Sequence, residues 1–340
     1  MIKFPKSINK ILVTGGSGFI GTTLVEKLIR NTNIQVYNLD KLGYASNSSK
    51  FLNSCESNRY VMLKVDLCNE EDTENAVKLS NPDLVFHLAA ESHVDRSIVE
   101  PKTFIDNNII GTFNLLKSLN IHWQRMEIKR KKSFRVLHVS TDEVFGSLFK
   151  DESFSEKSPY DPRNPYSATK AASDHLVRTW NNTYGLPTLI THSSNNYGPY
   201  QHSEKLIPTI INNALSKKEI PIYGDGKNIR DWIYVEDHVD ALIQVILQGK
   251  VGQSYCIGSE NQKTNLEIVE TICEFLDVYI PHNSPHIRFL KLVDDRKGHD
   301  RKYAINNRKI KEELNWMPKY DFKKGISRTI KWYQRLFFED

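Results

Sequence analysis

The chain has 340 residues, of which 39% are hydrophobic, enough for one large or two modest domains with a sizeable core. Its formal net charge of +5 is spread along the chain, which disfavours a protein built to bind nucleic acid or another polyanion. No stretch approaches the roughly 18 apolar residues of a membrane span, and the polar start lacks the apolar run of a signal peptide, so a cytoplasmic protein is expected.

Short β-rich segments alternate with longer helical patterns through the first half of the chain, which is typical of a parallel sheet with crossover helices. The predicted strands cover residues 11–14, 35–39, 61–65, 84–88, 135–140 and 188–192. The predicted helices cover residues 19–30, 70–79, 103–119 and 168–184. We therefore predict an α/β fold of the Rossmann type, with a doubly wound parallel sheet.

One dense basic run, from Lys129 to Lys132, follows the helical pattern that ends near Trp123. A solvated surface loop is expected there, ahead of the apolar stretch that begins at Phe134. A targeting signal or nucleic-acid patch is the alternative, but a lone basic tetrad often arises by chance.

After about residue 197 the alternation loosens into segments punctuated by proline and glycine, with helices predicted over residues 207–216, 236–248, 266–276 and 323–338. We divide the chain into a Rossmann domain over residues 1–197 and a smaller C-terminal lobe over residues 198–340, allowing chain crossings between the two. A ligand should lie in the cleft between them, beyond the carboxyl ends of the strands.

The cysteines are scattered without CxxC spacing, at positions Cys55, Cys68, Cys256 and Cys273. This pattern predicts neither a zinc site nor a disulfide framework, and no other metal site is indicated. We expect reduced, partly buried thiols.

A glycine run follows the first predicted strand and opens the first predicted helix. Gly15, Gly18 and Gly21 have the spacing G-x-x-G-x-x-G, with Phe19 and Ile20 between the last two. The first glycine can form a tight turn, the second lets backbone N–H groups approach a pyrophosphate, and the third lets the helix pack on the sheet. A plain turn is the alternative, but the strand–turn–helix context favours a dinucleotide site.

Asp40 ends the second predicted strand, 19 residues after Gly21, where a carboxylate can bond the ribose hydroxyls of adenosine. It would repel a 2′-phosphate, so NAD is favoured over NADP. The neighbouring Lys41 weakens this argument unless it is simply a solvated lysine. Further residues after the third and fourth strands would line the cofactor site: Asp66 and Leu67 by the adenine, then Leu88, Ala89 and Ala90 along the channel.

Tyr166 and Lys170 form a Tyr-x-x-x-Lys pair, which lies on one face of a helix. The lysine ammonium and a positive nicotinamide both favour the phenolate, moving the tyrosine pKa from about 10 toward the working range. Tyr166 could then take a proton from a hydroxyl group while hydride leaves the same carbon. A structural pair that arose by chance is the alternative.

Ser140, Thr141, Asp142 and Glu143 follow one another at the carboxyl end of a predicted strand, which is a typical site position. Paired acids can divide acid and base roles when their surroundings separate their pKa values, as an elimination of water requires. Helix capping is the alternative, because Thr and Asp are good N-cap residues and Glu suits a first turn.

With these motifs the sequence resembles the extended short-chain dehydrogenases/reductases, and within them the dTDP-glucose 4,6-dehydratases. The resemblance runs from about residue 11 to residue 335, nearly the whole chain. Related epimerases and decarboxylases share the glycine run and the Tyr-x-x-x-Lys pair but usually lack consecutive Asp and Glu after Thr141. Besides these motifs, the matching segments cover residues 87–97, 141–144, 195–199, 228–232 and 296–300.

This resemblance implies a three-step cycle with NAD tightly bound and regenerated in each turnover. Tyr166, helped by Thr141 and Lys170, deprotonates the glucose 4-hydroxyl as C4 gives hydride to NAD. The resulting 4-ketone acidifies the C5 proton, which Glu143 removes while Asp142 donates a proton to the departing 6-hydroxyl. Hydride then returns to C6 and leaves a 4-keto-6-deoxy sugar, so residues 1–197 become the NAD-binding domain and residues 198–340 the main sugar-nucleotide lobe.

The resemblance also implies further contacts. On the cofactor it places Tyr166, Lys170, Ser92, Asn107 and Asn196. Around the sugar nucleotide it places Ser92, Thr141, Asn195, Asn196, Lys205, Leu206, Tyr223, Arg230, Asn265, Arg296 and His299. The two arginines would face the diphosphate, which suits a planar, always charged guanidinium.

Two positions depart from the family pattern. Asn107 replaces a usual Thr near the nicotinamide, and Phe145 replaces a common Tyr after the Thr-Asp-Glu triplet. Both changes keep a similar size, so the chemistry is expected to be retained.

Three alternatives stay open beside a dehydratase that acts on dTDP-glucose. UDP-glucose could be the substrate of the same mechanism, an epimerase or decarboxylase would begin with the same C4 oxidation, and a catalytically silent NAD- or sugar-nucleotide-binding protein could share the fold. The intact tyrosine, lysine and paired acids argue against a silent protein. The resemblance also implies a homodimer built from helices 103–119 and 168–184, and a product that feeds rhamnose formation.

Overall fold

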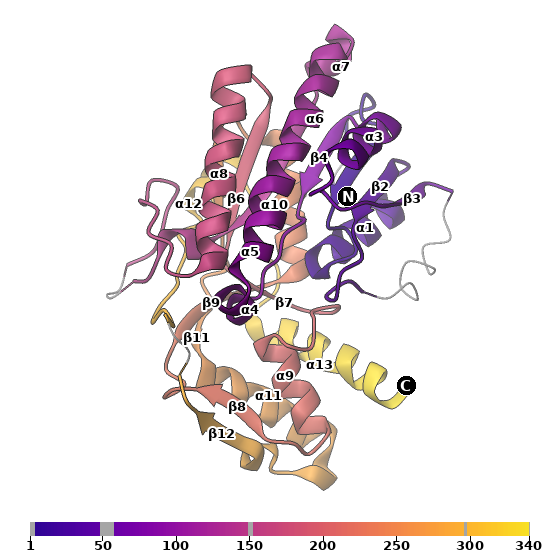
Figure 1. The fold of residues 1–340 in the computed structure, drawn as a ribbon. Helices are drawn as coiled ribbons and strands as arrows, with labels where there is room; N and C mark the ends of the chain where they lie inside the picture. The colour runs from indigo at the N-terminus through magenta and orange to yellow at the C-terminus, as the bar shows by residue number, and fades with distance from the viewer. Residues whose placement is uncertain (1–3, 48–57, 149–151, 296–297, 340) are drawn as a thin grey trace.

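Two lobes are visible in the chain, the upper one built around a sheet and the lower one around α9, α11 and α13 (Figure 1). The structure, a computed structural model, describes residues 4–47, 58–148, 152–295 and 298–339. Cys55 and Arg296 lie outside the described residues. Within these ranges no helix is long and apolar enough to cross a membrane.

The upper lobe contains a seven-stranded sheet in the order β10-β6-β5-β4-β1-β2-β3, and all of its strand pairs are parallel. Ile11 and Val13 of β1 enter the core on one face, whereas Leu12 enters the core on the other. A parallel sheet covered on both faces has such continuous apolar strands. The strands are β1 (Lys10–Thr14), β2 (Gln35–Asp40), β3 (Tyr60–Lys64), β4 (Leu84–His87), β5 (Arg135–Thr141), β6 (Thr188–Ser193) and β10 (Ser254–Ile257).

Helices cover both faces of this sheet, which confirms the predicted doubly wound α/β fold. One core holds apolar residues of α1 (Phe19–Asn31), α10 (Val235–Gln248) and α12 (Arg308–Leu314). The core on the opposite face holds apolar residues of α3 (Glu70–Ser80), α6 (Gly111–Arg125) and α8 (Pro165–Tyr184). β10 and α10 follow residue 197 in the sequence, yet they lie in this upper lobe.

The segment before β5 differs from the single predicted helix 103–119. It consists of α4 (Val94–Val99), α5 (Pro101–Phe104), the π-helical turn η1 (Ile105–Ile110) and then α6. Inside the turn, the Asn108 side chain donates to Thr169 Oγ1 of α8 over 2.9 Å and accepts from the Glu91 backbone N over 2.8 Å. π-helical turns are rare and often occur at functional sites.

The surface loop predicted for Lys129 to Lys132 is wrong, because α7 (Ile128–Lys131) forms there. Arg130 fixes this helical turn by donating to both Asp83 Oδ1, over 2.6 Å, and the Asn81 side chain, over 3.0 Å. Lys131 lies over the Trp123 ring, 4.3 Å from its centroid. The basic run is therefore tied to its own domain through two of its side chains.

The lower lobe packs α9 (Leu206–Leu215), α11 (Asn265–Tyr279) and α13 (Phe322–Glu339) around a separate apolar core. A three-stranded sheet joins β7 (Asn195–Tyr197), β9 (Ile229–Tyr234) and β11 (Gln262–Thr264), and β8 (Ile220–Tyr223) pairs with β12 (Leu290–Val293). Short 3-10 turns η2 (Asp142–Phe145), η3 (Pro281–Asn283) and η4 (His286–Phe289) complete the described elements.

Candidate active site

A cavity of about 340 Å³ lies at the carboxyl ends of the sheet strands and extends to the loop that leads into α9. Ligands of doubly wound folds bind at this edge of the sheet. All the residues predicted for the cofactor line the cavity, as do these catalytic and substrate predictions: Thr141, Asp142, Glu143, Tyr166, Lys170, Ser92, Asn195, Asn196 and Lys205.

The glycine turn at one end of the cavity has no room for a Cβ at Gly15 or Gly21. Gly15 has φ +69°, and a Cβ there would lie 2.7 Å from the Ala89 backbone. A Cβ on Gly21 would lie 2.1 Å from the Gly15 carbonyl oxygen, so this glycine lets the start of α1 approach the turn. The geometry agrees with the close backbone approach that a dinucleotide pyrophosphate needs.

Asp40 holds this turn from the end of β2. Its Oδ2 accepts from the Ser17 backbone N over 3.0 Å, and its Oδ1 accepts from the Leu42 backbone N over 2.8 Å. Asp40 is 8% exposed and lines the cavity, where its carboxylate fits ribose hydroxyls and disfavours a 2′-phosphate.

Lys41 is not a solvated lysine. Its Nζ donates to Glu91 Oε1 and to Asn107 Oδ1, each over 2.7 Å. The Glu91 carboxylate offsets the lysine charge, so the argument for NAD that rests on Asp40 stands. Asn107, the departure from the family pattern, takes part in this contact through its amide oxygen.

Thr141 ends β5 and caps the short turn η2, because its Oγ1 accepts from the Glu143 backbone N over 3.3 Å. Thr141 therefore caps this turn, and Thr141, Asp142 and Glu143 all line the cavity. Asp142 is 1% exposed, and burial, followed by the charges of Glu143 and Asp231, raises the pKa of its carboxyl well above the ordinary value. Asp142 can hold a proton at neutral pH, whereas Glu143 is only partly buried.

The Tyr166–Lys170 pair sits in the first turns of α8. Asn164 caps this helix in a capping box with Ser167, and Pro165 occupies its first position, which sets where Tyr166 enters the cavity. Burial raises the pKa of Tyr166, as does the Glu143 charge, while a hydrogen bond with Thr141 lowers it.

Lys170 is 4% exposed, and its Nζ donates to the Val139 carbonyl oxygen over 2.9 Å. Burial lowers the pKa of Lys170 to about 8. The tyrosine site by itself therefore disfavours the phenolate, whereas the sequence predicted a lowered pKa for Tyr166.

Several polar atoms in the cavity wall are buried without a hydrogen-bond partner among the described residues: Asp142 Oδ2, Ser194 Oγ, Asn196 Oδ1 and Gln201 Oε1. Buried polar atoms are nearly always paired in folded proteins, so these atoms fit a polar ligand. Ser194 and Gln201 were not predicted, although both flank the Asn195 to Pro199 motif.

Tyr44 and Glu204 are two further cavity residues that the sequence did not predict. Tyr44, from the loop after β2, donates to Glu204 Oε1 over 3.1 Å, and the Arg96 guanidinium lies 3.7 Å from the Tyr44 ring centroid. Lys205 Nζ donates to the Ser92 carbonyl oxygen over 2.8 Å. These contacts connect loops of the two lobes at the rim of the cavity.

The remaining substrate predictions lie outside the described cavity wall, at Leu206, Tyr223, Arg230, Asn265 and His299. Arg230 is 5% exposed, donates to the Asp300 carbonyl oxygen over 2.9 Å and lies over the Tyr303 ring. His299 Nδ1 lies 2.6 Å from Asp295 Oδ1. Contacts of these residues with a ligand stay predictions.

Comparison with known proteins agrees with this geometry. The family model described as GDP-mannose 4,6 dehydratase matches residues 12–329. The dTDP-glucose 4,6-dehydratase of Haemophilus influenzae is 51% identical over 329 residues, covering 95% of this chain and 97% of that protein. The same enzyme of Neisseria meningitidis serogroup B is 49% identical over 331 residues, covering 96% of this chain and 93% of that protein.

The solved structure of the dTDP-glucose 4,6-dehydratase from Bacillus anthracis, in complex with NAD, is 39% identical and has a TM-score of 0.84. It matches 96% of this chain and 97% of its own. The fold and nearly the whole length of the chain are thus shared with these relatives. The chain belongs to the NDP-sugar 4,6-dehydratase family of the NAD-dependent extended short-chain dehydrogenases/reductases.

Proposed function

We propose that this chain is a hydro-lyase that converts dTDP-glucose to dTDP-4-keto-6-deoxyglucose. One observation carries the proposal: Asp142 and Glu143 leave β5 side by side in different surroundings, in the same cavity as Tyr166 and Lys170. A buried acid that keeps its proton beside an accessible carboxylate is the pair that an elimination of water needs.

The first step oxidises C4 of the glucose. NAD, held by the glycine turn and Asp40, supplies the hydride acceptor for C4 and later the hydride donor for C6. Tyr166 takes the proton of the 4-hydroxyl, and the Lys170 ammonium stabilises the phenolate that does so. Thr141 orients the tyrosine hydroxyl through their hydrogen bond.

The second step removes water across C5 and C6. The 4-ketone makes the C5 proton acidic, and Glu143 accepts that proton as the C6–oxygen bond breaks. Asp142 donates its proton to the departing hydroxyl, which leaves as water. When C6 is reduced, Glu143 returns its proton to C5. The proton that Tyr166 took from the 4-hydroxyl reprotonates Asp142. The net change over the cycle is the loss of one water.

The test is turnover with the two candidate nucleotides. Purified, NAD-loaded protein should release a product one water lighter from dTDP-glucose, with a higher kcat/KM than from UDP-glucose. A higher kcat/KM for UDP-glucose would contradict the nucleotide assignment alone. Recovery of both substrates at full mass would contradict the dehydratase.

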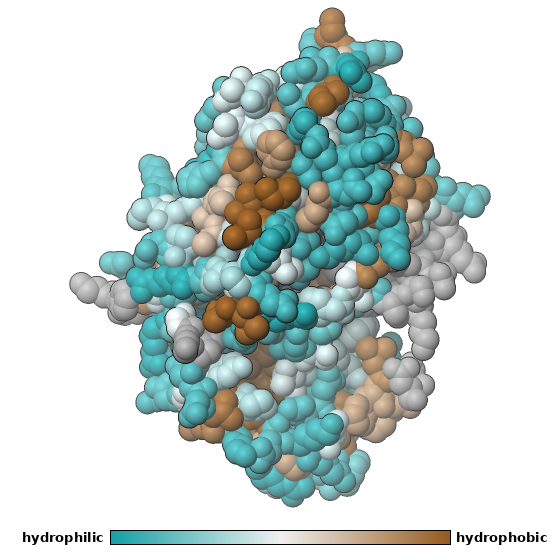
Figure 2. Space-filling view, in the orientation of Figure 1, coloured by the Kyte–Doolittle hydropathy of each residue, from teal (hydrophilic) through white to brown (hydrophobic). Residues whose placement is uncertain are grey.

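We also infer a homodimer from one exposed apolar surface. Ile105 and Ile110 of η1, Phe113 of α6 and Tyr184 of α8 are 37% to 48% exposed, and Figure 2 shows a hydrophobic patch over this helical layer. Exposed apolar patches mark association surfaces. Sedimentation should give a dimer, and Phe113→Glu should weaken it, whereas a monomer at micromolar concentration would contradict the inference.

The destination of the product in rhamnose formation and the cytoplasmic location stay predictions.

A further inference from the structure

Asp174 is a buried acid that the mechanism above does not use. It lies on α8 four residues after Lys170, and its side chain is 0% exposed. Burial of an ionised carboxylate costs several kcal/mol unless hydrogen bonds and opposite charges compensate it. Such a residue in the middle of a helix therefore needs an explanation.

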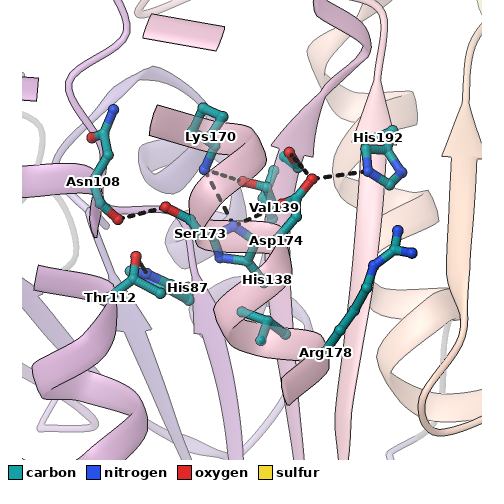
Figure 3. A network of polar contacts seen from close by, with 12 residues as sticks. His87, Asn108, Thr112, His138, Val139, Lys170, Ser173, Asp174, Arg178 and His192 are labelled. Carbon is teal, nitrogen blue, oxygen red and sulfur yellow. Dashed lines mark hydrogen bonds and ion pairs between the residues drawn. The ribbon is translucent and has the colours of Figure 1, made fainter. Parts of the chain in front are cut away.

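Donors from two strands and a loop surround this carboxylate, and Figure 3 shows Asp174 between His138 and His192. Its Oδ2 accepts from Ser140 Oγ over 2.9 Å, from Tyr160 OH over 2.8 Å and from His192 Nε2 over 3.0 Å. Its Oδ1 lies 3.2 Å from His138 Nε2. Burial alone would raise the pKa of Asp174, but the two histidines that lie against its oxygens hold it below the ordinary value, so the group is an anion at neutral pH.

The same network reaches the catalytic lysine. His138 Nε2 lies 3.5 Å from Lys170 Nζ as well as 3.2 Å from Asp174 Oδ1, so the imidazole stands between the two charges. Tyr166, Lys170 and Asp174 follow at steps of four residues, which puts all three on one face of α8.

Two histidines of neighbouring strands and Asp174 of the same helix interact with this lysine. His87 of β4 has a ring 5.1 Å from that of His138, and burial lowers the pKa of both, to about 4 for His138. Both imidazoles are therefore neutral at pH 7. The Asp174 charge opposes the burial that lowers the pKa of Lys170.

We propose that Asp174 is a positioning residue for the dehydration: its carboxylate keeps Lys170 as an ammonium ion behind Tyr166, with His138 held between them. The inference rests on the proposed function, since it assigns a role toward the tyrosine base. A purely structural clamp between α8 and the strands β5 and β6 is the competing explanation. The positioning role requires the negative charge of Asp174, whereas the structural clamp requires only its hydrogen bonds.

The experiment compares the pH dependence of kcat for water loss in NAD-loaded variants. Asp174→Asn keeps the shape of the side chain and removes its charge. The alkaline limb of the kcat–pH profile should therefore move to lower pH by about 1–3 units, which is the effect of losing one nearby opposite charge. Its KM for dTDP-glucose should change much less than kcat. Asp174→Glu keeps the charge, and its limb should stay near the wild-type position even if its melting temperature falls.

Tyr160→Phe is the matched control, because it removes one neutral donor to the same Oδ2 and leaves the charge. Tyr160 lies outside the cavity wall, so the alkaline limb of the kcat–pH profile should not move in Tyr160→Phe. Asp174→Ser is a second neutral variant in case Asn does not fit. An unshifted limb in a folded neutral variant, or a failure of both neutral variants to fold even with NAD, would overturn the positioning role in favour of a clamp.

A readout that needs no turnover separates this inference from the proposed function. Reductive methylation of Lys170, followed by mass spectrometry of its peptide, reports the unprotonated fraction of the amine as the pH rises. Methylation should begin at lower pH in Asp174→Asn than in the wild type or in Tyr160→Phe. Equal methylation profiles would overturn the inference, whereas a wild type that leaves dTDP-glucose intact would contradict the proposed function instead.

Discussion

Replacement of Asp142 by asparagine separates the chemical role of this acid from its cost to folding. Asp142 is 1% exposed, and burial, Glu143 and Asp231 raise the pKa of its carboxyl well above the ordinary value. Because the pKa of Asp142 is higher in the folded chain than in the unfolded chain, the folded chain binds more protons. The free energy of unfolding therefore falls as the pH rises above the ordinary pKa of an aspartate. Each unit of such a shift corresponds to about 1.4 kcal/mol.

Asp142→Asn should therefore be more stable than the wild type at pH 7, by about 1 kcal/mol or more, since the wild type must take up a proton at Asp142 when it folds and the amide need not. The gain should vanish below about pH 3, where Asp142 is protonated in both the folded and unfolded chains. Urea unfolding of both proteins across this pH range, at fixed NAD concentration, measures the difference.

The same variant should lose the proton donor for the 6-hydroxyl. We expect kcat for water loss to fall by about 10²–10⁴-fold, the usual contribution of a general acid. Oxidation at C4 should continue and appear as the absorbance of bound reduced nicotinamide. An Asp142→Asn enzyme that turns over normally, or that is less stable than the wild type at pH 7, would refute this reasoning.

Three further variants test separate parts of the site. Glu143→Gln should block product formation yet permit C4 oxidation, seen as bound reduced nicotinamide; normal dehydration by this variant would make the base assignment wrong. Asp40→Ala should weaken NAD binding by about 10–100-fold in calorimetry, because a charged acceptor is lost from the Ser17 and Leu42 contacts and from the ribose; an unchanged Kd would contradict the role of Asp40. Gly21→Ala should lower the melting temperature and NAD affinity together, since its Cβ would lie 2.1 Å from the Gly15 oxygen; wild-type values of both would count against the packing argument.

The first half of the fold could be predicted because its strands are apolar and regularly spaced. The strand β10 was missed, since it has only four residues after a turn at Gly252 and shows no usable alternation. The π-helical turn was also missed. It depends on contacts of Asn108 with Thr169 and Glu91, which are distant in the sequence.

The candidate site was predictable where a motif ends a strand or starts a helix. Asp142 and Glu143 follow β5 directly, and the cavity opens at that edge. Asp174 gave no comparable signal, because an acidic residue in a helix usually marks the solvent face. Its one sequence cue is the four-residue step from Lys170.

Transfer of the C4 hydrogen tests the central claim most directly. Incubation of the NAD-loaded protein with dTDP-glucose that carries deuterium at C4 should give a product one water lighter with the deuterium at C6. A product of full substrate mass, or a dehydrated product without deuterium at C6, would contradict the account.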